Sequence, residues 1–156
     1  MIEIYTDGSS RGNPGPGGYG TVLIYKQHRK ELSQGFRKTT NNRMELLAVI
    51  VGLEAITVPN SNVVITSDSK YVVDSIEKKW VFGWVKKGFK DKKNPDLWKR
   101  FLKVYELHNV KMKWIKGHAG HTENERCDVL AVQAATSQNL LIDEGFEQTE
   151  NNPNLF

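Results

Sequence analysis

The hydrophobic pattern of the chain switches between two periods, one typical of strands and one typical of helices. Near the start, Ile2, Ile4 and Thr6 alternate with Glu3 and Tyr5, which predicts a strand. Within 40–56, apolar residues recur at helical spacing and predict a helix whose buried face comprises Met44, Leu47, Ala48, Val51 and Ala55. The same reasoning predicts a glycine-rich loop at 8–20, a hairpin of 19–25 with 31–37, strands at 62–66 and 110–115, and helices at 69–77, 96–107 and 122–135, the last with a capping box of Thr122 and Glu125.

The order of these elements predicts the fold class. Helices lie between the later strands, which implies parallel pairing there, whereas the early hairpin is antiparallel. We therefore expect an α/β protein with a mixed five-stranded sheet flanked by helices. Residues 1–136 are expected to form one domain, and 137–156 a loosely ordered acidic tail without strong periodicity.

The bulk composition narrows the class of protein. A chain of 156 residues that is 38% hydrophobic fits a single globular domain with a real core. Its single cysteine, Cys127, rules out an internal disulfide framework. There is no apolar run near the roughly 20 residues of a membrane span, and no secretory signal pattern at the start. We expect a cytoplasmic monomer that does not engage membranes.

Charge is spread unevenly along the chain. The net charge is +4, yet the stretch 78–103 carries ten Lys or Arg against only Asp91 and Asp96, a local charge of about +8. A solvated lysine-rich loop is the ordinary interpretation of such a run. Aromatic residues are interleaved here, however, and they can stack on sugars or bases while the cations hold phosphates. These aromatics are Trp80, Phe82, Trp84, Phe89 and Trp98.

Four acidic residues stand in unusual local contexts: Asp7, Glu45, Asp68 and Asp128. Each has a plain structural interpretation. Asp7 fits a turn, Glu45 a capping box with Asn42, Asp68 a helix N-cap, and Asp128 an exposed helix position. If the fold gathers them, the carboxylates repel one another and need hard cations such as Mg²⁺ or Mn²⁺. A two-metal carboxylate cluster on a basic protein points to phosphodiester chemistry.

His118 lies in a glycine-flanked loop between the last predicted strand and helix. A histidine there suits proton transfer near neutral pH, although the loop could also carry it incidentally. With His121 and Cys127 it also suggests zinc, but the second ligand pair of a structural site is missing. The segment 12–18 lacks the ending of a P-loop and the spacing of a dinucleotide motif, and is interpreted as a shaped loop.

Taken together, these motifs resemble type 1 ribonuclease H of bacteria. The segments that carry the likeness occur in the family's order and extend to about Ala135. They are 5–9, 12–20, 39–46, 66–69 and 116–128. The resemblance implies the ribonuclease H fold and an endonuclease that cuts the RNA strand of RNA–DNA hybrids. It also implies two Mg²⁺ ions, with Mn²⁺ as an alternative, and products with 5′-phosphate and 3′-hydroxyl ends.

The resemblance also assigns residues by position. Asp7, Glu45, Asp68 and Asp128 match the catalytic metal-binding carboxylates, and His118 matches the catalytic histidine. The positions that match hybrid contacts, with Thr40 and Asn13 in a phosphate pocket, are Gly12, Asn13, Thr40, Asn41, Asn42, Lys70, Trp80, Trp84, Lys86, Lys87 and Lys90. Two positions depart from the pattern: Lys70 replaces a glutamine, and Phe89 replaces a common tryptophan.

Three rival interpretations stay open at this point. A resolvase or transposase core of the same fold would cut duplex DNA, but the asparagine-rich segment and the basic block argue against it. A non-catalytic hybrid-binding module would bind without cutting, although all four carboxylates and His118 are present. A structural scaffold would not need the acidic set at all.

Overall fold

Six strands and six helices make up residues 1–151, the part of the chain that this computed structural model describes. The strands are β1 (Ile2–Ser10), β2 (Gly15–Tyr25), β3 (His28–Thr39), β4 (Asn62–Ser67), β5 (Asn109–Trp114) and β6 (Leu140–Leu141). The helices are α1 (Asn41–Glu54), α2 (Lys70–Glu77), α3 (Trp80–Lys86), α4 (Pro95–Tyr105), α5 (Thr122–Ala135) and α6 (Glu144–Asn151). None of the helices in this range has the length and apolar character needed to cross a membrane.

The strands form one mixed sheet in the order β5-β4-β1-β2-β3-β6. Strands β1, β2 and β3 pair antiparallel, whereas β4 pairs parallel with both β1 and β5. The predicted α/β class and mixed sheet are confirmed. The sixth strand is a two-residue addition, β6, which pairs parallel with β3.

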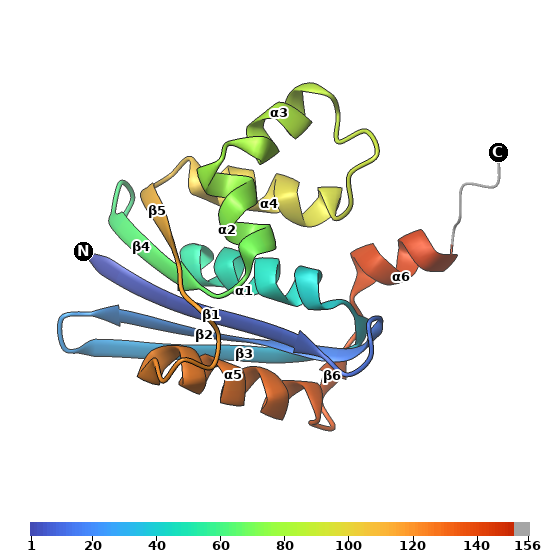
Figure 1. Cartoon of the computed structure of the whole chain (residues 1–156), viewed down its shortest axis with the longest axis horizontal. Coiled ribbons are helices and arrows are strands. Elements are labelled where there is room, and N and C mark those ends of the chain that lie inside the picture. The colour runs from blue at the N-terminus through green and yellow to red at the C-terminus, as the bar shows by residue number, and fades with distance from the viewer. Residues whose placement is uncertain (152–156) are drawn as a thin grey trace.

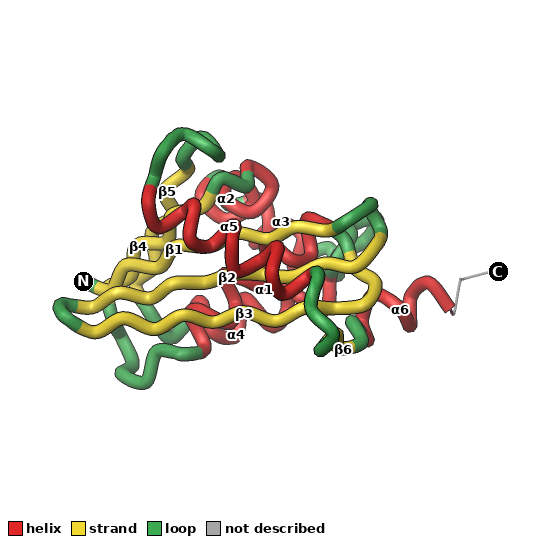
Figure 2. The backbone as a smooth tube through the Cα atoms, turned by 90° about the horizontal axis from the view of Figure 1, so that it is seen from below, coloured by secondary structure: helices red, strands yellow, loops and turns green. Residues whose placement is uncertain are grey.

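Helices cover both faces of the sheet. Helix α1 packs across β1 and β2, with α2, α3 and α4 on the same side, and α5 covers β1, β2 and β3 from the other side (Figures 1 and 2). Glycines in the strands permit the close approach of α5. A Cβ atom on Gly20 would lie 2.2 Å from the Cys127 carbonyl oxygen, and one on Gly35 would lie 2.0 Å from that of Ala134. The prediction of a loop over 8–20 was wrong outside 11–14, because glycines of this segment such as Gly18 and Gly20 lie in a strand and pack against α5.

Helix α1 is buried on nearly all sides rather than along one face. Leu46, Val49 and Ile50 are fully buried, although none belongs to the predicted face. Helix α4 covers the side of α1 that faces away from the sheet, and its Trp98 and Phe101 are fully buried as well. The periodic pattern predicted a single buried face and so missed this burial, because a helix covered on both sides is apolar on both.

The helix N-termini leave the candidate carboxylates free of capping roles. Thr40 caps α1 by accepting a hydrogen bond from the Arg43 amide at 3.2 Å, so Asn42 is not the cap. Ser69 caps α2 in the same way, so Asp68 is not the cap either. The structural interpretations of Glu45 and Asp68 as capping residues are thereby excluded.

Two further predictions about helices differ from the structure. The capping box on α5 was wrong, because His121 is the N-cap residue and Thr122 already belongs to the helix. Helix α3 was not predicted, because its sequence is short, aromatic and interrupted by Gly83. This helix carries the first part of the basic, aromatic block.

A buried arginine fastens the C-terminal segment to the rest of the fold. The Arg43 guanidinium donates to both oxygens of Asp143, at 2.7 and 2.8 Å, and to both oxygens of Asp96, at 2.9 and 2.7 Å. The Thr39 hydroxyl donates to Asp143 at 2.7 Å. Arg43 lies in the first turn of α1 and Asp96 in the first turn of α4, so one side chain joins three segments that are distant in sequence.

The acidic segment after Ser137 contains regular structure up to residue 151, where the sequence predicted a loose tail. Strand β6 pairs with β3, and α6 is joined to β3 by the ion pairs Arg37–Glu147 and Lys38–Glu150. These partners are more than 100 positions apart, so no local pattern signals them. The last part of the predicted tail, 152–156, lies outside the described residues.

We predict that Arg43→Met lowers the free energy of unfolding by about 3 kcal/mol, because it leaves a buried carboxylate without its positively charged partner. Urea unfolding followed by circular dichroism measures the change. Arg37→Met is the matched control, since it breaks an exposed ion pair and is expected to have a much smaller effect. Equal changes in the two variants would contradict the structural role given to Arg43.

Candidate active site

Parallel pairing of β1 with β4 brings two carboxylates to one edge of the sheet. Tyr5 lies opposite Thr66 in this register, so Asp7 and Asp68, each two residues further on, emerge side by side. Glu45 reaches the same place from the first turns of α1. Carboxylate oxygens of Asp7, Glu45 and Asp68 all lie within 4.8 Å of one another. The structure thus brings together three of the four predicted carboxylates.

Gly8 sets how closely α1 approaches β1 at this cluster. A Cβ atom on Gly8 would lie 2.4 Å from the Glu45 backbone nitrogen, so a larger residue would push the helix away. The Gly8 amide donates to Asp7 Oδ1 at 2.9 Å and also to the Glu45 carboxylate. One backbone N–H therefore orients two of the candidate ligands.

Crowding and burial shift the acid strength of these groups. Burial is the largest cause that raises the pKa of Asp7, to about 7; the negative charge of Asp68 adds to it, and hydrogen bonding with Glu45 opposes it. Burial and then the charge of Asp7 raise the pKa of Glu45 well above its usual range. Full ionisation of the cluster therefore needs compensating positive charge.

Asp128, the fourth predicted carboxylate, approaches from α5 on the opposite face of the sheet. It is half-buried, and its side chain interacts with Asp7 and adds to the rise in the pKa of Asp7. It stands outside the group of oxygens that lie within 4.8 Å of one another. Asp128 thus borders the cluster at Asp7.

The donor set fits a hard divalent cation. The cluster offers carboxylate oxygens alone, which suit Mg²⁺, Mn²⁺ or Ca²⁺ better than zinc. Its buried, mutually repelling charges would gain most from a bound cation. Asp7, Glu45 and Asp68 are therefore compatible with a divalent metal site.

The loop after β5 carries His118 past the same edge. A Cβ atom on Gly117 would lie 2.5 Å from Asp68 Oδ2, so the loop backbone passes close to that carboxylate. His118 follows with a left-handed φ of 57° and is exposed to solvent. His118 follows Gly117, which passes Asp68, but it does not belong to the group of close ligand atoms formed by Asp7, Glu45 and Asp68.

The asparagine-rich segment forms a small hydrogen-bonded unit beside Glu45. Asn41 Oδ1 accepts from the Ser10 amide at 2.7 Å, and Asn13 Oδ1 accepts from the Asn41 amide at 3.1 Å. Gly12, Asn13, Asn41 and Asn42 are all exposed, and Thr40 is half-buried at the helix cap. The structure brings these predicted contact residues together at the start of α1.

The basic block is built around α3 and the loop after it. Trp80 is 46% exposed, whereas Trp84 is half-buried against Trp98, with ring centroids 5.9 Å apart. Phe89 is buried, so it belongs to the packing of this unit rather than to its outer surface. Lysine ammonium groups lie 5.3 Å from the Trp80 ring centroid and 5.1 Å from that of Trp84. Lys86, Lys87 and Lys90 are exposed.

One residue at this edge was missed by sequence reasoning. Trp114, the last residue of β5, donates its indole N–H to the Asp68 carbonyl oxygen at 3.1 Å. The only sequence signal was an aromatic residue at the end of a predicted strand, just before the His118 loop. That pattern is common in ordinary cores, so it did not single Trp114 out.

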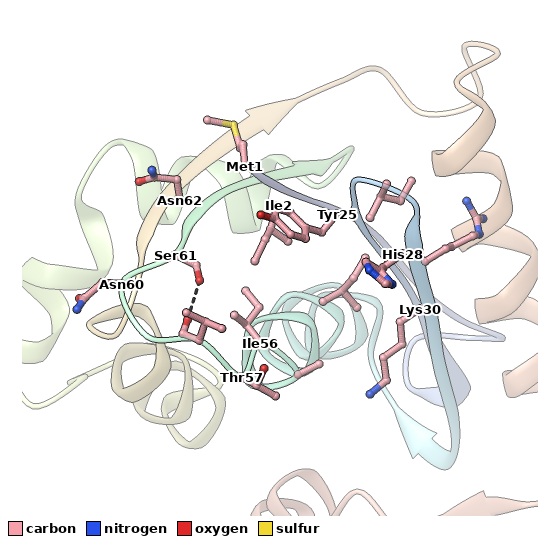
Figure 3. A pocket seen from close by; sticks show the side chains of 15 residues that line it. Met1, Ile2, Tyr25, His28, Lys30, Ile56, Thr57, Asn60, Ser61 and Asn62 are labelled. Carbon is pink, nitrogen blue, oxygen red and sulfur yellow. Dashed lines mark hydrogen bonds between the residues drawn. The ribbon is translucent and has the colours of Figure 1, made fainter.

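A pocket of about 560 Å³ lies at the other end of the sheet (Figure 3). It is formed by the start of β1, the β2–β3 turn and the segment after α1, with Ile2, Tyr25, His28, Lys30 and Ile56 among its lining residues. None of its lining residues is Asp or Glu. This pocket therefore offers no carboxylate ligand for a metal ion, and the Asp7, Glu45 and Asp68 cluster lies outside it.

Solved structures place this architecture in a known class. LC9-RNase H1, a type 1 RNase H with the type 2 active-site motif, has a TM-score of 0.78 and 36% identity, covering 94% of this chain and 79% of that chain. LC11-RNase H1 in complex with an RNA/DNA hybrid has a TM-score of 0.63 and 28% identity, covering 86% and 96%. The sheet, its helices and the acidic edge thus define an α/β protein of the ribonuclease H fold.

Sequence comparison narrows this class to a family. The family described as RNase H matches residues 1–136. A ribonuclease H of Desulforamulus reducens is 61% identical over 147 residues, covering 91% of this chain and 92% of that protein. One of Shewanella amazonensis is 56% identical over 152 residues, covering 94% and 96%. The chain belongs to the ribonuclease H family, and family membership supports a hydrolase of the nuclease type.

We predict that the metal-free protein loses stability as the pH rises through about 7. The pKa of Asp7 is higher in the folded protein, about 7, than its ordinary 3.8, so folding is favoured most below about pH 4 and this contribution disappears above pH 7. Asp7→Asn should therefore stabilise the metal-free protein at pH 8, on the order of 1 to 4 kcal/mol, and little at pH 4. Thermal melts in EDTA test this.

The same melts with added Mg²⁺ supply the control. Because the cation binds the ionised cluster, it should raise the melting temperature of the wild type more at pH 8 than at pH 5. A wild-type minus Asp7→Asn difference that does not change with pH would contradict the crowding of these carboxylates.

Proposed function

We propose that the protein is an endonuclease that hydrolyses the RNA strand of RNA–DNA hybrids with the help of divalent metal ions. The observation that carries the proposal is the cluster of Asp7, Glu45 and Asp68, whose oxygens lie within 4.8 Å of one another in a member of the ribonuclease H family. The hybrid bound to LC11-RNase H1, a structural neighbour, supports the substrate class.

In this proposal, Asp7, Glu45, Asp68 and Asp128 hold the metal ions. Divalent ions held there would supply charge neutralisation at the scissile phosphate and a lowered pKa of the attacking water. The carboxylates contribute binding and orientation: the Gly8 N–H fixes Asp7 and Glu45, and β1–β4 pairing fixes Asp68. In-line attack on phosphorus would leave 5′-phosphate and 3′-hydroxyl ends. Mg²⁺ is the proposed ion, with Mn²⁺ as an alternative.

His118 is proposed to move a proton at this site. Its exposed position on the loop that passes Asp68 supports that role, because an imidazole there can meet both solvent and the phosphate. It would take a proton from the attacking water or assist departure of the product. A histidine so placed does not need to bind metal itself.

Selection of a hybrid requires contact with both strands. The exposed unit of Gly12, Asn13, Asn41 and Asn42 offers backbone and amide groups that can hydrogen-bond a ribose 2′-hydroxyl, the group that distinguishes RNA from DNA. Thr40 and Asn13 are proposed to hold a DNA phosphate. The unit adjoins Glu45 along α1, so strand recognition would take place beside the metal site.

The basic block is proposed to dock the hybrid through its backbone. Lys86, Lys87 and Lys90 are exposed around α3, and Trp80 and Trp84 lie beneath lysine ammonium groups. Phosphate contacts of this kind are independent of sequence and depend strongly on salt. Lys70, at the start of α2, is proposed as a phosphate contact nearer the metal site.

The primary test is cleavage of a strand-labelled RNA–DNA hybrid with and without Mg²⁺. We expect metal-dependent cutting of the RNA strand alone, and a loss of more than about 100-fold in Asp7→Asn. Asp74→Asn, an acidic residue of α2 paired with Lys78, is the control and should cut normally. Binding without cutting would indicate a hybrid-binding module, and cutting of duplex DNA would indicate a resolvase-like enzyme.

A second prediction concerns the basic block. Replacing Lys86, Lys87 and Lys90 with glutamine should raise KM, leave kcat nearly unchanged and lower the slope of log KM against log salt by about 2 to 3. Replacing Lys26 and Lys30, at the β2–β3 turn at the far end of the sheet, removes similar charges and should have little effect per charge removed. If the salt slope of this variant stays at the wild-type value, the basic block does not take part in docking the hybrid.

A further inference from the structure

Trp114 lies at the metal-site edge, yet nothing in the chemistry proposed so far uses it. It ends β5, the outermost strand on that side of the sheet, and its side chain is 43% exposed. Its indole N–H donates to the Asp68 carbonyl at 3.1 Å. A large aromatic ring is thus held at the surface and is hydrogen-bonded to the main chain of a candidate metal ligand.

A lysine stands over this ring. The Lys70 ammonium lies 4.9 Å from the Trp114 ring centroid, within the range of a cation–π interaction. Among the described residues, no carboxylate lies within 4.0 Å of the Lys70 ammonium, although the acidic cluster is nearby. This cation is held by an aromatic ring instead of an acid, so its charge stays available to an anion.

The pair is separate from the basic block around α3. Trp114 is part of the sheet, and Lys70 is the first residue of α2. Helix α3 lies farther from the sheet, beyond α2 (Figure 1). Exposed aromatic rings next to cations suit sugar–phosphate chains, because the ring packs on a sugar or base while the cation binds phosphate.

We infer that Trp114 and Lys70 form a subsite for the RNA strand beside the scissile phosphate. Trp114 packs against a sugar or base of the neighbouring nucleotide, and Lys70 binds its phosphate. The strand is the RNA strand because Trp114 is bonded to Asp68, whose carboxylate belongs to the cluster that acts on RNA in the proposed function, on which this subsite rests. Trp114 is also a positioning residue, since its N–H fixes the Asp68 backbone.

The chain offers a matched control at the far end of the sheet. Lys26 lies 5.3 Å from the ring centroid of Tyr25, and that tyrosine is also 43% exposed. This second pair is an exposed ring with a lysine over it, but it lies at the β2–β3 turn, away from the carboxylates. Any general effect of losing an exposed ring or a surface charge will appear there as well.

The experiment measures the Kd of a fluorescent RNA–DNA hybrid at several salt concentrations, in an Asp7→Asn background that prevents cleavage. We expect Trp114→Ala to raise Kd about 5- to 10-fold, and Lys70→Gln to lower the salt slope by about 1. Trp114→Phe keeps the ring and should stay within about 2-fold of the parent. Tyr25→Ala and Lys26→Gln should not change binding.

A second readout separates the two roles of Trp114. With Asp7 intact, Trp114→Phe should lower kcat for hybrid cleavage while KM changes little, because only the hydrogen bond to Asp68 is lost. Lys70→Gln should raise KM instead. Lys70 is exposed at the start of α2, so this variant tests the subsite even if Trp114→Ala is poorly folded.

Two results would overturn the subsite. One is Trp114→Ala and Lys70→Gln matching the Tyr25→Ala and Lys26→Gln controls in Kd and salt slope. The other is Trp114→Phe weakening binding as much as Trp114→Ala, which would assign the loss to the hydrogen bond and not to the ring. A wild type that neither binds nor cuts the hybrid would instead overturn the proposed function, and the subsite with it.

Discussion

Mutual repulsion between crowded carboxylates, two of them buried, is the constraint around which this end of the molecule is arranged. Asp7, Glu45 and Asp68 lie within 4.8 Å of one another, and burial raises the pKa of Asp7 to about 7. Such a cluster opposes folding when it is ionised, so the surrounding structure must hold it together. The parallel pairing of β1 with β4, and the direct contact of Gly8 with α1, provide that rigidity. A bound divalent cation would relieve this repulsion, and metal binding would then be linked to stability.

The rest of the fold holds α1 in place. Its position matters for the site because α1 carries Glu45 together with Asn41 and Asn42 of the asparagine-rich unit. The helix is covered by the sheet on one side and by α4 on the other, so it has little freedom to shift. Arg43, two residues before Glu45, is bonded to Asp96 and Asp143 and ties the start of α1 to α4 and to the C-terminal segment. Residues far from the carboxylates therefore determine where Glu45 sits.

Positive charge and aromatic rings occur at two distances from the metal-site edge. The block around α3 stands away from the sheet and suits docking of a polyanion through many weak, salt-sensitive contacts. Trp114 is hydrogen-bonded to the Asp68 backbone and carries Lys70 over its ring, and the subsite proposed for this pair would hold a single nucleotide. Among residues 1–151, the Lys70 ammonium lies over the Trp114 ring and forms no ion pair with a carboxylate. In the proposed function, this edge would attract a phosphate chain and still leave the carboxylates free to hold a metal cation.

Sequence alone determined the α/β class, five of the six strands, four of the six helices and the residue types of the candidate site, because hydrophobic periodicity is a local signal. It could not decide whether Glu45 and Asp68 were capping residues or members of a cluster, because the local sequence fits both interpretations. The structure decided this, since Thr40 and Ser69 are the N-cap residues of α1 and α2. It also missed the strand packing of the glycine-rich segment, helix α3, the tie from Arg43 to Asp143, and Trp114. Each depends on contacts between residues distant in sequence, and only the tertiary structure creates such contacts.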